Sequence, residues 1–181
     1  MTEPSDDTLV SRAAAGDRRA FAELLERHYD RIYRLGMRLL GDADAAADLA
    51  QDVCVGLPGK LVSFRGDSRF TTWLYRVVVN AARDAMRRAA TRRRMENHYG
   101  EVEAMQRAPD AARQREAIWL RNSLARLSED LRTTVVLVVG EGLGHAEAGR
   151  VLGVAESTVS WRMGEVRKRL RALAVDEETQ S

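Results

Sequence analysis

Arginine side chains are the groups in this chain whose chemistry is most evident. Arg76, Asn80, Arg83 and Arg87 follow one another at intervals of four, three and four residues. On an α-helix this spacing puts all four on one face. A plain solvated face would mix charge signs, and only Asp84 dilutes this one. Because guanidinium groups bind phosphate well, the face is typical of nucleic-acid contact.

A second pattern of this kind lies near the C-terminus. Apolar residues alternate at four and three from Val159 to Leu173, which makes one helical stripe. Gly153 separates this helix from a shorter one, where Ala148 and Gly149 are small enough for the two helices to cross closely. The pattern predicts a helix-turn-helix whose second helix enters the DNA major groove. A structural hairpin with a solvated basic face is the alternative.

The second helix of this pair also carries local weaknesses. Ala155 stands where a capping Ser, Thr or Asp is favoured, and Gly164 lies in the helix interior. Each costs about 1 kcal/mol, so packing of the apolar stripe must outweigh both. The outward face of this helix carries Ser157, Ser160, Trp161, Arg167 and Lys168.

Acidic residues gather in the first third of the chain. Residues 1–57 hold eleven acidic and seven basic side chains, whereas residues 60–94 hold two acidic and ten basic ones. In the helix predicted from Ala43 to about Leu57, one polar face consists of Asp44, Asp48, Gln51 and Asp52. This face is either simply solvated or a docking surface for a basic protein.

The elements that must position these residues are all helices. A short helix is expected over Leu9–Ala15, and a long one follows Asp17 to about Leu40. Pro58-Gly59 is expected to end the next helix, and a polar loop over 64–69 precedes the arginine-bearing helix.

The apolar period fades over residues 95–112 and resumes from residue 113, with Ser128 as the cap of a helix over 129–139. The predicted fold is all-α, with two small helical domains, a bundle (1–94) and a helix-turn-helix domain (113–175). A flexible linker (95–112) joins them, and a disordered tail (176–181) follows.

Composition excludes several classes of function. The 181 residues contain one cysteine, Cys54, so no internal disulfide can form, and no run is apolar enough to span a membrane. An acidic N-terminus is unlike a signal peptide, which favours the cytoplasm. His28, His98 and His145 are scattered, and neither a metal-ligand spacing nor a nucleophile–base set is present. We therefore expect no enzyme, metal or cofactor.

The chain resembles the extracytoplasmic-function (ECF) sigma factors of the sigma-70 family. Residues 48–53 resemble the helix that grips the clamp helices of the RNA polymerase β′ subunit. Residues 64–76 are very similar to the family's −10 loop and the helix that follows it. Residues 127–132 and those from Leu143 onward resemble the domain that reads the −35 element.

The resemblance implies partners and binding residues. The partners would be the β′ and β subunits of core polymerase, promoter DNA and an anti-sigma factor. By this resemblance, the residues that would bind core polymerase are Asp44, Asp48, Leu49, Gln51 and Asp52. The residues that would bind the −10 element are Phe64, Arg65, Gly66, Asp67, Ser68, Arg69, Arg76, Asn80, Arg83 and Arg87. The residues that would bind the −35 element are Glu156, Ser157, Thr158, Ser160, Trp161, Arg162, Arg167 and Lys168.

Departures from the family pattern indicate a divergent subgroup. Ser128 replaces a usual proline, and Ala155 a usual serine, so a promoter sequence cannot be borrowed from other members. One rival remains, a helix-turn-helix regulator with an N-terminal sensing domain. Such a domain has no need of a helix bearing Arg76, Asn80 and Arg83, and a pull-down of core polymerase separates the two hypotheses.

Overall fold

The computed structural model describes residues 3–96, 119–120 and 122–180, and within them every regular element is helical. The helices are α1 (Asp6–Ala14), α2 (Arg18–Leu40), α3 (Ala43–Leu61), α4 (Phe70–Glu96), α6 (Glu129–Val135), the π-helix η1 (Val136–Gly140), α7 (His145–Leu152) and α8 (Glu156–Gln180). Short helical stretches also cover 119–120 and 122–125. The all-α prediction is confirmed.

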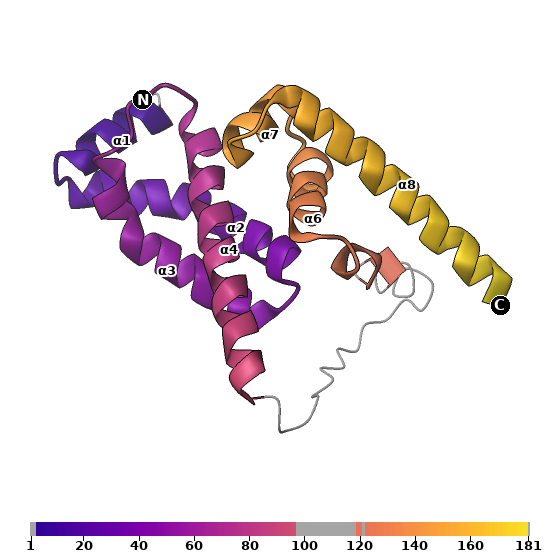
Figure 1. Cartoon of the computed structure of the whole chain (residues 1–181). Coiled ribbons are helices and arrows are strands. Elements are labelled where there is room, and N and C mark those ends of the chain that lie inside the picture. Colours follow the sequence, from indigo (N-terminus) through magenta and orange to yellow (C-terminus); the bar gives the residue numbers. More distant parts are fainter. Residues whose placement is uncertain (1–2, 97–118, 121, 181) are drawn as a thin grey trace.

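Helices α1 to α4 form the N-terminal bundle (Figure 1). The predicted apolar stripe of α2 faces inward, and Leu24, Ile32 and Leu35 are at most 1% exposed. Burying each such side chain stabilises the fold by about 1.5–3 kcal/mol. Gly36 lets α3 approach closely, because a Cβ there would lie 3.1 Å from Cδ2 of Leu49.

The beginning and end of α2 follow from two residues. Oδ1 of Asp17 accepts hydrogen bonds from the backbone N–H groups of Arg19 at 2.9 Å and Ala20 at 3.1 Å. The Ala20 N–H, with the Arg12 guanidinium next in effect, lowers the pKa of the Asp17 carboxyl. Gly41 ends the helix in the left-handed conformation, at φ +73°.

The boundaries of α3, α1 and α8 differ from those predicted. Helix α3 continues through Pro58 to Leu61, because Leu61 is 1% exposed in the bundle core and its burial favours the extra turn. Helix α1 begins at Asp6, where Ser5 caps it by accepting from the Thr8 N–H at 3.3 Å. Helix α8 reaches Gln180, where a disordered tail was expected. Glu and Gln are good helix formers and prolong α8.

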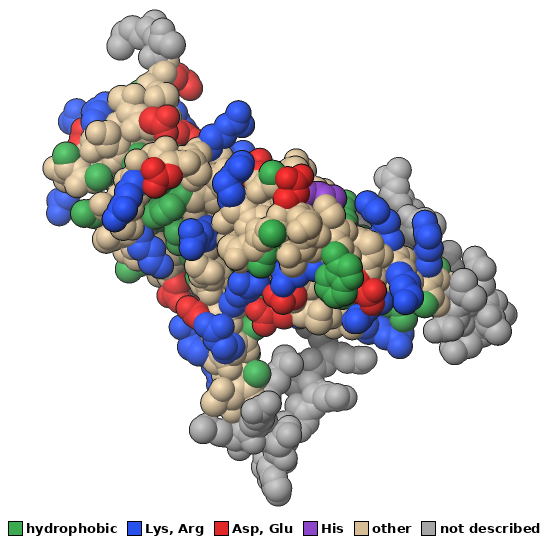
Figure 2. Space-filling view, turned by 45° about the horizontal axis from the view of Figure 1, so that its top comes forward, with side chains coloured by type: hydrophobic (Ala, Val, Ile, Leu, Met, Phe, Trp, Pro, Cys, Tyr) green, Lys and Arg blue, Asp and Glu red, His purple; other side chains and the backbone are tan. Residues whose placement is uncertain are grey.

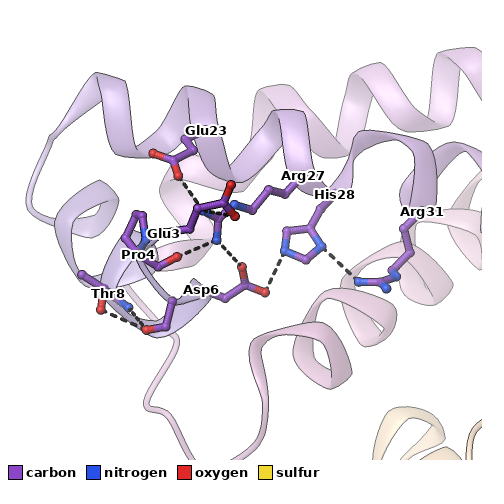
Figure 3. A network of polar contacts seen from close by, with 9 residues as sticks. Glu3, Pro4, Asp6, Thr8, Glu23, Arg27, His28 and Arg31 are labelled. Atoms are coloured by element: carbon purple, nitrogen blue, oxygen red, sulfur yellow. Dashed lines mark hydrogen bonds and ion pairs between the residues drawn. The ribbon is translucent and has the colours of Figure 1, made fainter. Parts of the chain in front are cut away.

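A polar network ties α1 to α2 (Figure 3). Nη1 of Arg27 donates to the Pro4 carbonyl at 2.7 Å, and His28 Nε2 lies 2.9 Å from Oδ2 of Asp6. Nη1 of Arg31 lies 3.2 Å from His28 Nδ1. These partners fit a neutral imidazole that donates through Nε2 and accepts at Nδ1. Burial lowers the pKa of His28, against the opposing effect of Asp6.

The C-terminal half is built on α6, η1, α7 and α8. The segment predicted as a helix over 129–139 is helical: α6 covers Glu129–Val135, and the π-helix η1 continues it to Gly140. Ser128 stands at the N-cap position of α6, but its side chain makes no capping hydrogen bond. In the core, Leu137, Val159 and Val166 are at most 1% exposed. The predicted stripe of α8 therefore packs inward along its first three turns.

The two halves lie against each other in the structure. Helix α4 runs between the N-terminal bundle on one side and α6 and α7 on the other, while α8 projects away (Figure 1). Helix α2 also contacts η1. Helix α4 extends two residues into the predicted linker, to Glu96, and residues 97–112 of that linker lie outside the described residues.

Candidate nucleic-acid and polymerase interface

The loop over 64–69 is anchored at both ends by aromatic rings. Phe64 packs edge-on against Phe70 and Trp73, with ring centroids 5.9 and 5.4 Å apart, and Phe70 meets His28 at 5.2 Å. Phe70 is 2% exposed, whereas Phe64 and Trp73 are half-buried. Gly66 takes φ +75°, a conformation that other residues seldom adopt. The polar residues between the two phenylalanines are thus held out toward solvent.

The predicted basic face on α4 is only partly free. Arg76 and Asn80 are exposed, and so is Arg87, which pairs with Asp84. Arg83 differs, because its side chain is 22% exposed and lies 3.2 Å from both Glu129 and Asp130 of α6. The helix that carries this face also meets the C-terminal half.

The acidic face on α3 has the exposure that a docking surface needs. Asp44, Asp48, Gln51 and Asp52 are all exposed. Leu49 departs from the expectation for this surface, since it is 3% exposed and belongs to the bundle core. Its side chain packs near Gly36 and supports the face from beneath.

The helix-turn-helix has the predicted tight turn. Gly153 takes φ +70°, and a Cβ on Gly149 would lie 2.7 Å from the backbone oxygen of Val154. Both positions therefore require glycine. On α8, Glu156, Ser157, Ser160, Trp161, Arg167 and Lys168 are exposed, and Thr158 is half-buried. Trp161 stands out, because 66% of so large an apolar side chain is exposed.

Arg162 is the exception among the predicted residues of α8. Its side chain is only 12% exposed, and Nη2 donates to Oδ2 of Asp130 at 2.7 Å. Arg83 Nη2 donates to the other carboxylate oxygen of Asp130 at 3.2 Å. One acidic residue of α6 thus holds two arginines that were predicted to bind two different stretches of DNA.

Further contacts between the halves involve residues that the sequence did not single out. The Tyr75 hydroxyl donates to Oε2 of Glu141 at 2.9 Å, and Arg38 pairs with Oε1 of the same carboxylate. Arg38 also donates to the Gly140 carbonyl at 2.7 Å. Thr72 donates to Oε1 of Glu147 at 2.6 Å. In the sequence, Glu141 stands out only by the glycines on either side of it, and these do not indicate which residues it contacts.

The surroundings of these contacts are polar. A groove between the loop and α7 is lined by Asp67, Ser68, Arg69, Thr72, Glu147 and Arg150. Over the face shown in Figure 2, Lys and Arg side chains are spread across both halves with Asp and Glu side chains between them. Burial raises the pKa of the Tyr75 hydroxyl to about 12, and its hydrogen bond to Glu141 adds to the shift.

Other kinds of site find little support in the described residues. No three His, Cys, Asp or Glu side chains in that part of the chain are placed to hold a metal ion together. Cys54 is half-buried, and burial raises the pKa of its thiol, which disfavours the reactive thiolate. None of the described helices is long and apolar enough to cross a bilayer.

Comparison with known proteins gives a consistent result over both halves. The family Sigma-70 region 2 matches residues 24–92, and Sigma-70, region 4 matches residues 117–170. The ECF RNA polymerase sigma factor SigM of Mycobacterium tuberculosis is 36% identical over 172 residues. That match covers 94% of this chain and 85% of SigM.

Two solved structures have a similar fold. CnrH, a sigma factor of Cupriavidus metallidurans, was solved in complex with the cytosolic domain of CnrY. It shares 29% identity at a TM-score of 0.70, over 94% of this chain and 97% of its own. The sigma factor RpoE of Bartonella quintana, solved with the anti-sigma factor NepR, has a TM-score of 0.69 at 24% identity, over 85% and 96% of the two chains. On the family matches and the full-length similarity to SigM, the chain belongs to the ECF sigma factors of the sigma-70 family.

Proposed function

We propose that this ECF sigma factor uses three separate surfaces to direct RNA polymerase to its promoters. The docking face, defined as Asp44, Asp48, Gln51 and Asp52 on α3, binds a basic surface of the core enzyme. The loop over 64–69 and the exposed face of α4 bind the −10 element. Helix α8 reads the −35 element. The division into residues 1–94, 95–112 and 113–175 is part of the same proposal.

The exposure of the docking face is the observation that carries this assignment. Four polar side chains, three of them acidic, lie together on α3 with Leu49 buried beneath them. Complementary charge speeds the encounter of two proteins and fixes their register. The docking face is therefore suited to a basic partner.

Opening of the −10 element requires a site that holds an unpaired strand. Arg76 is exposed on α4 and suits contact with phosphates, and the exposed Asn80 suits a base edge. The loop between Phe64 and Phe70 presents polar groups around a position where an extruded base can lie. Extrusion costs a few kcal/mol of stacking, which phosphate and pocket contacts offset.

Recognition of the −35 element falls on the first turns of α8. Ser157, Ser160 and Trp161 are exposed near the N-terminus of the helix, the part that approaches base edges in this motif. Arg167 and Lys168 lie further along and suit phosphate contacts, which position the helix without reading sequence.

The family supplies two further elements of the proposal. RpoE of Bartonella quintana binds an anti-sigma factor, and we infer a partner of that class for this chain. The chemistry of RNA synthesis belongs to the polymerase. The sigma factor contributes promoter recognition and strand opening, and it has no catalytic residue. Its site of action is the cytoplasm, with the polymerase.

Binding to core polymerase tests the docking face directly. Asp48→Arg with Gln51→Ala places a positive charge where the partner is basic, and we expect at least a tenfold loss of affinity. Glu26→Arg makes the same charge reversal at an exposed position of α2 and serves as the control. Fluorescence anisotropy of the labelled protein with core enzyme measures both variants. Unchanged affinity in the double variant removes the docking assignment.

A further inference from the structure

We propose that His145 is a positioning residue for promoter recognition. It holds the hydroxyl of Ser160 so that Ser160 accepts a hydrogen bond from an exocyclic amino group, that of an adenine or a cytosine, in the −35 element. His145 is the first residue of α7 and Ser160 lies on the second turn of α8, with Nδ1 of the imidazole 2.8 Å from Oγ of the serine. The inference rests on the proposed function, because it deepens the assignment of α8 to the −35 element.

A serine hydroxyl by itself discriminates poorly between base edges. It both donates and accepts, and it rotates to suit whichever group lies opposite. Serine therefore pairs with donors and acceptors alike in the major groove. A neighbour that takes the hydroxyl proton leaves only the lone pairs of the oxygen for the base. Ser160 is exposed on α8 and has such a neighbour in His145.

The close crossing of α7 and α8 brings the two side chains together. Gly149 lets the helices approach, because a Cβ there would lie 2.7 Å from the Val154 backbone oxygen. Val159, which precedes Ser160, is 0% exposed, and its burial fixes the rotation of α8 so that Ser160 faces outward. The start of α8 lies against α7 (Figure 1), and His145 meets Ser160 there across 15 positions of the chain.

The direction of the hydrogen bond follows from the chemistry of its two partners. An unprotonated imidazole nitrogen is a stronger base than a hydroxyl oxygen, so the hydroxyl is the better donor of the two. DNA favours the same direction. Nδ1 faces Ser160, which leaves Nε2 for a second partner. In a helix-turn-helix the first helix crosses the phosphate backbone, and a phosphate oxygen accepts from the tautomer that carries its proton on Nε2.

The consequence is a preference for one kind of base edge. With its proton donated to His145, Oγ of Ser160 offers lone pairs, which suit the N6 amino group of adenine or the N4 amino group of cytosine. The O6 of guanine, the O4 of thymine and the N7 of a purine are acceptors and repel the same lone pairs. His145 is half-buried and Ser160 exposed, so the hydrogen bond strengthens once DNA excludes water from it.

Two substitutions of His145 separate its two contacts. Asparagine carries Oδ1 where histidine carries Nδ1, so His145→Asn keeps an acceptor for Ser160 and loses the group that reaches the phosphate. His145→Leu has the size and branching of asparagine but neither of these groups. Ser160→Ala removes the hydroxyl itself. Arg167→Ala removes an exposed cation of α8 and tests the placement of this helix on DNA independently.

Binding of promoter DNA is the first measurement. Holoenzyme assembled from the full chain and core polymerase is titrated with synthetic duplexes of a promoter mapped by run-off transcription, in which each −35 base pair is changed in turn. Ser160→Ala and His145→Leu should relax discrimination about three- to tenfold at the same base pair. The double variant should relax it no further, because the two residues act through one contact. His145→Asn should weaken binding to all duplexes alike and keep the preference.

Base analogues identify the group that Ser160 contacts. At the base pair found above, purine in place of adenine, or 2-pyrimidinone in place of cytosine, removes the amino group, and a 7-deaza base removes N7. Loss of the amino group should weaken binding by the wild type about three- to tenfold more than binding by Ser160→Ala. Loss of N7 should affect both proteins equally. A Ser160-dependent preference set by N7 or by a carbonyl oxygen overturns the proposal.

The tautomer of His145 is measured without any DNA. Proton–nitrogen correlation spectra of the isotope-labelled full chain distinguish a proton on Nε2 from one on Nδ1, and the His145→Asn spectrum identifies the signals of His145. At about pH 8, where histidine side chains in water are neutral, the wild type should carry the proton on Nε2. Ser160→Ala should shift the ring toward a mixture of tautomers. A proton on Nδ1 in the wild type overturns the proposal.

These outcomes are distinguishable from failure of the proposed function. If Arg167→Ala weakens binding while Ser160→Ala changes no base preference, α8 keeps its assignment and the role of His145 alone is wrong. If neither Arg167→Ala nor any change in the −35 element affects binding, α8 does not lie on that element, and the role of His145 is overturned together with that assignment.

Discussion

The Tyr75 hydroxyl donates a 2.9 Å hydrogen bond to Oε2 of Glu141, joining residues 66 positions apart in the chain. Tyr75 lies on the inner side of α4, and Glu141 follows directly after η1. The bond therefore connects the helix assigned to the −10 element with the domain assigned to the −35 element. Because the phenol is buried there, its ionisation reports whether the two halves are in contact.

The titration of Tyr75 follows from that burial. Its pKa is raised from 10 to about 12. The stabilisation that Tyr75 gives to the contact between the two halves is therefore fully present below pH 10 and is lost as the pH rises toward 12. Tyr75 should therefore ionise late in a near-ultraviolet tyrosinate titration. Arg38→Gln with Asp130→Asn weakens the contacts between the two halves, and in this variant the pKa of Tyr75 should fall toward 10. A wild type without a late step contradicts the burial.

Gly149 is expected to tolerate no side chain. A Cβ there meets the Val154 backbone oxygen at 2.7 Å, and a backbone atom cannot move aside as a side chain can. Gly149→Ala should lower the free energy of unfolding by about 1–3 kcal/mol. Gly164→Ala is the matched control, because a Cβ there would meet nothing within 4 Å beyond its chain neighbours and the backbone of its own helix. It should raise stability by about 0.5–1 kcal/mol. Urea unfolding distinguishes the two, and equal effects would count against the close crossing of α7 and α8.

The pH dependence of stability should carry a contribution from His28. Burial lowers its pKa below 6.5, so the unfolded chain binds the proton more readily than the folded one. The contribution of neutral His28 to stability is therefore fully present above pH 6.5, and it is lost as the pH falls through the pKa of His28 in the folded state. Urea unfolding at stepped pH values should show this loss in the wild type. His28→Gln should flatten it, and an unchanged pH slope in that variant would refute the contribution.

The exposed part of α4 should matter for opening the promoter and little for binding polymerase. Arg76→Ala and Asn80→Ala each remove a group free to contact the −10 strand, at a cost of about 1–3 kcal/mol in promoter opening. Permanganate reactivity of unpaired thymines measures opening, and anisotropy measures core binding. Arg19→Ala, on the exposed side of α2, serves as the control. Equal loss of opening and core binding would mean that the face is structural.

Local chemistry made most of the helices predictable from sequence. Asp17 and Gly41 bound α2 because one accepts from free backbone N–H groups and the other adopts a left-handed conformation without strain. Gly149 and Gly153 marked the tight crossing of the helix-turn-helix for the same kind of reason. Each of these signals depends only on neighbours within a few residues.

Tertiary packing decided the features that were missed. Helix α3 passes Pro58 because Leu61, three residues on, is buried in the bundle core. Periodicity placed Arg83 on a polar face, but it could not show that Asp130, 47 residues away, lies opposite. The contacts of Tyr75, Glu141 and Arg38 depend in the same way on how the two halves pack.

Transcription by reconstituted holoenzyme tests the central claim most directly. Core polymerase is mixed with the purified protein and supplied with fragments of the source genome, and run-off RNAs are mapped. The account predicts transcripts that begin at discrete positions only when the protein is present, and their loss with Asp48→Arg and Gln51→Ala but not with Glu26→Arg. Equal transcription by core enzyme with and without the protein would contradict it.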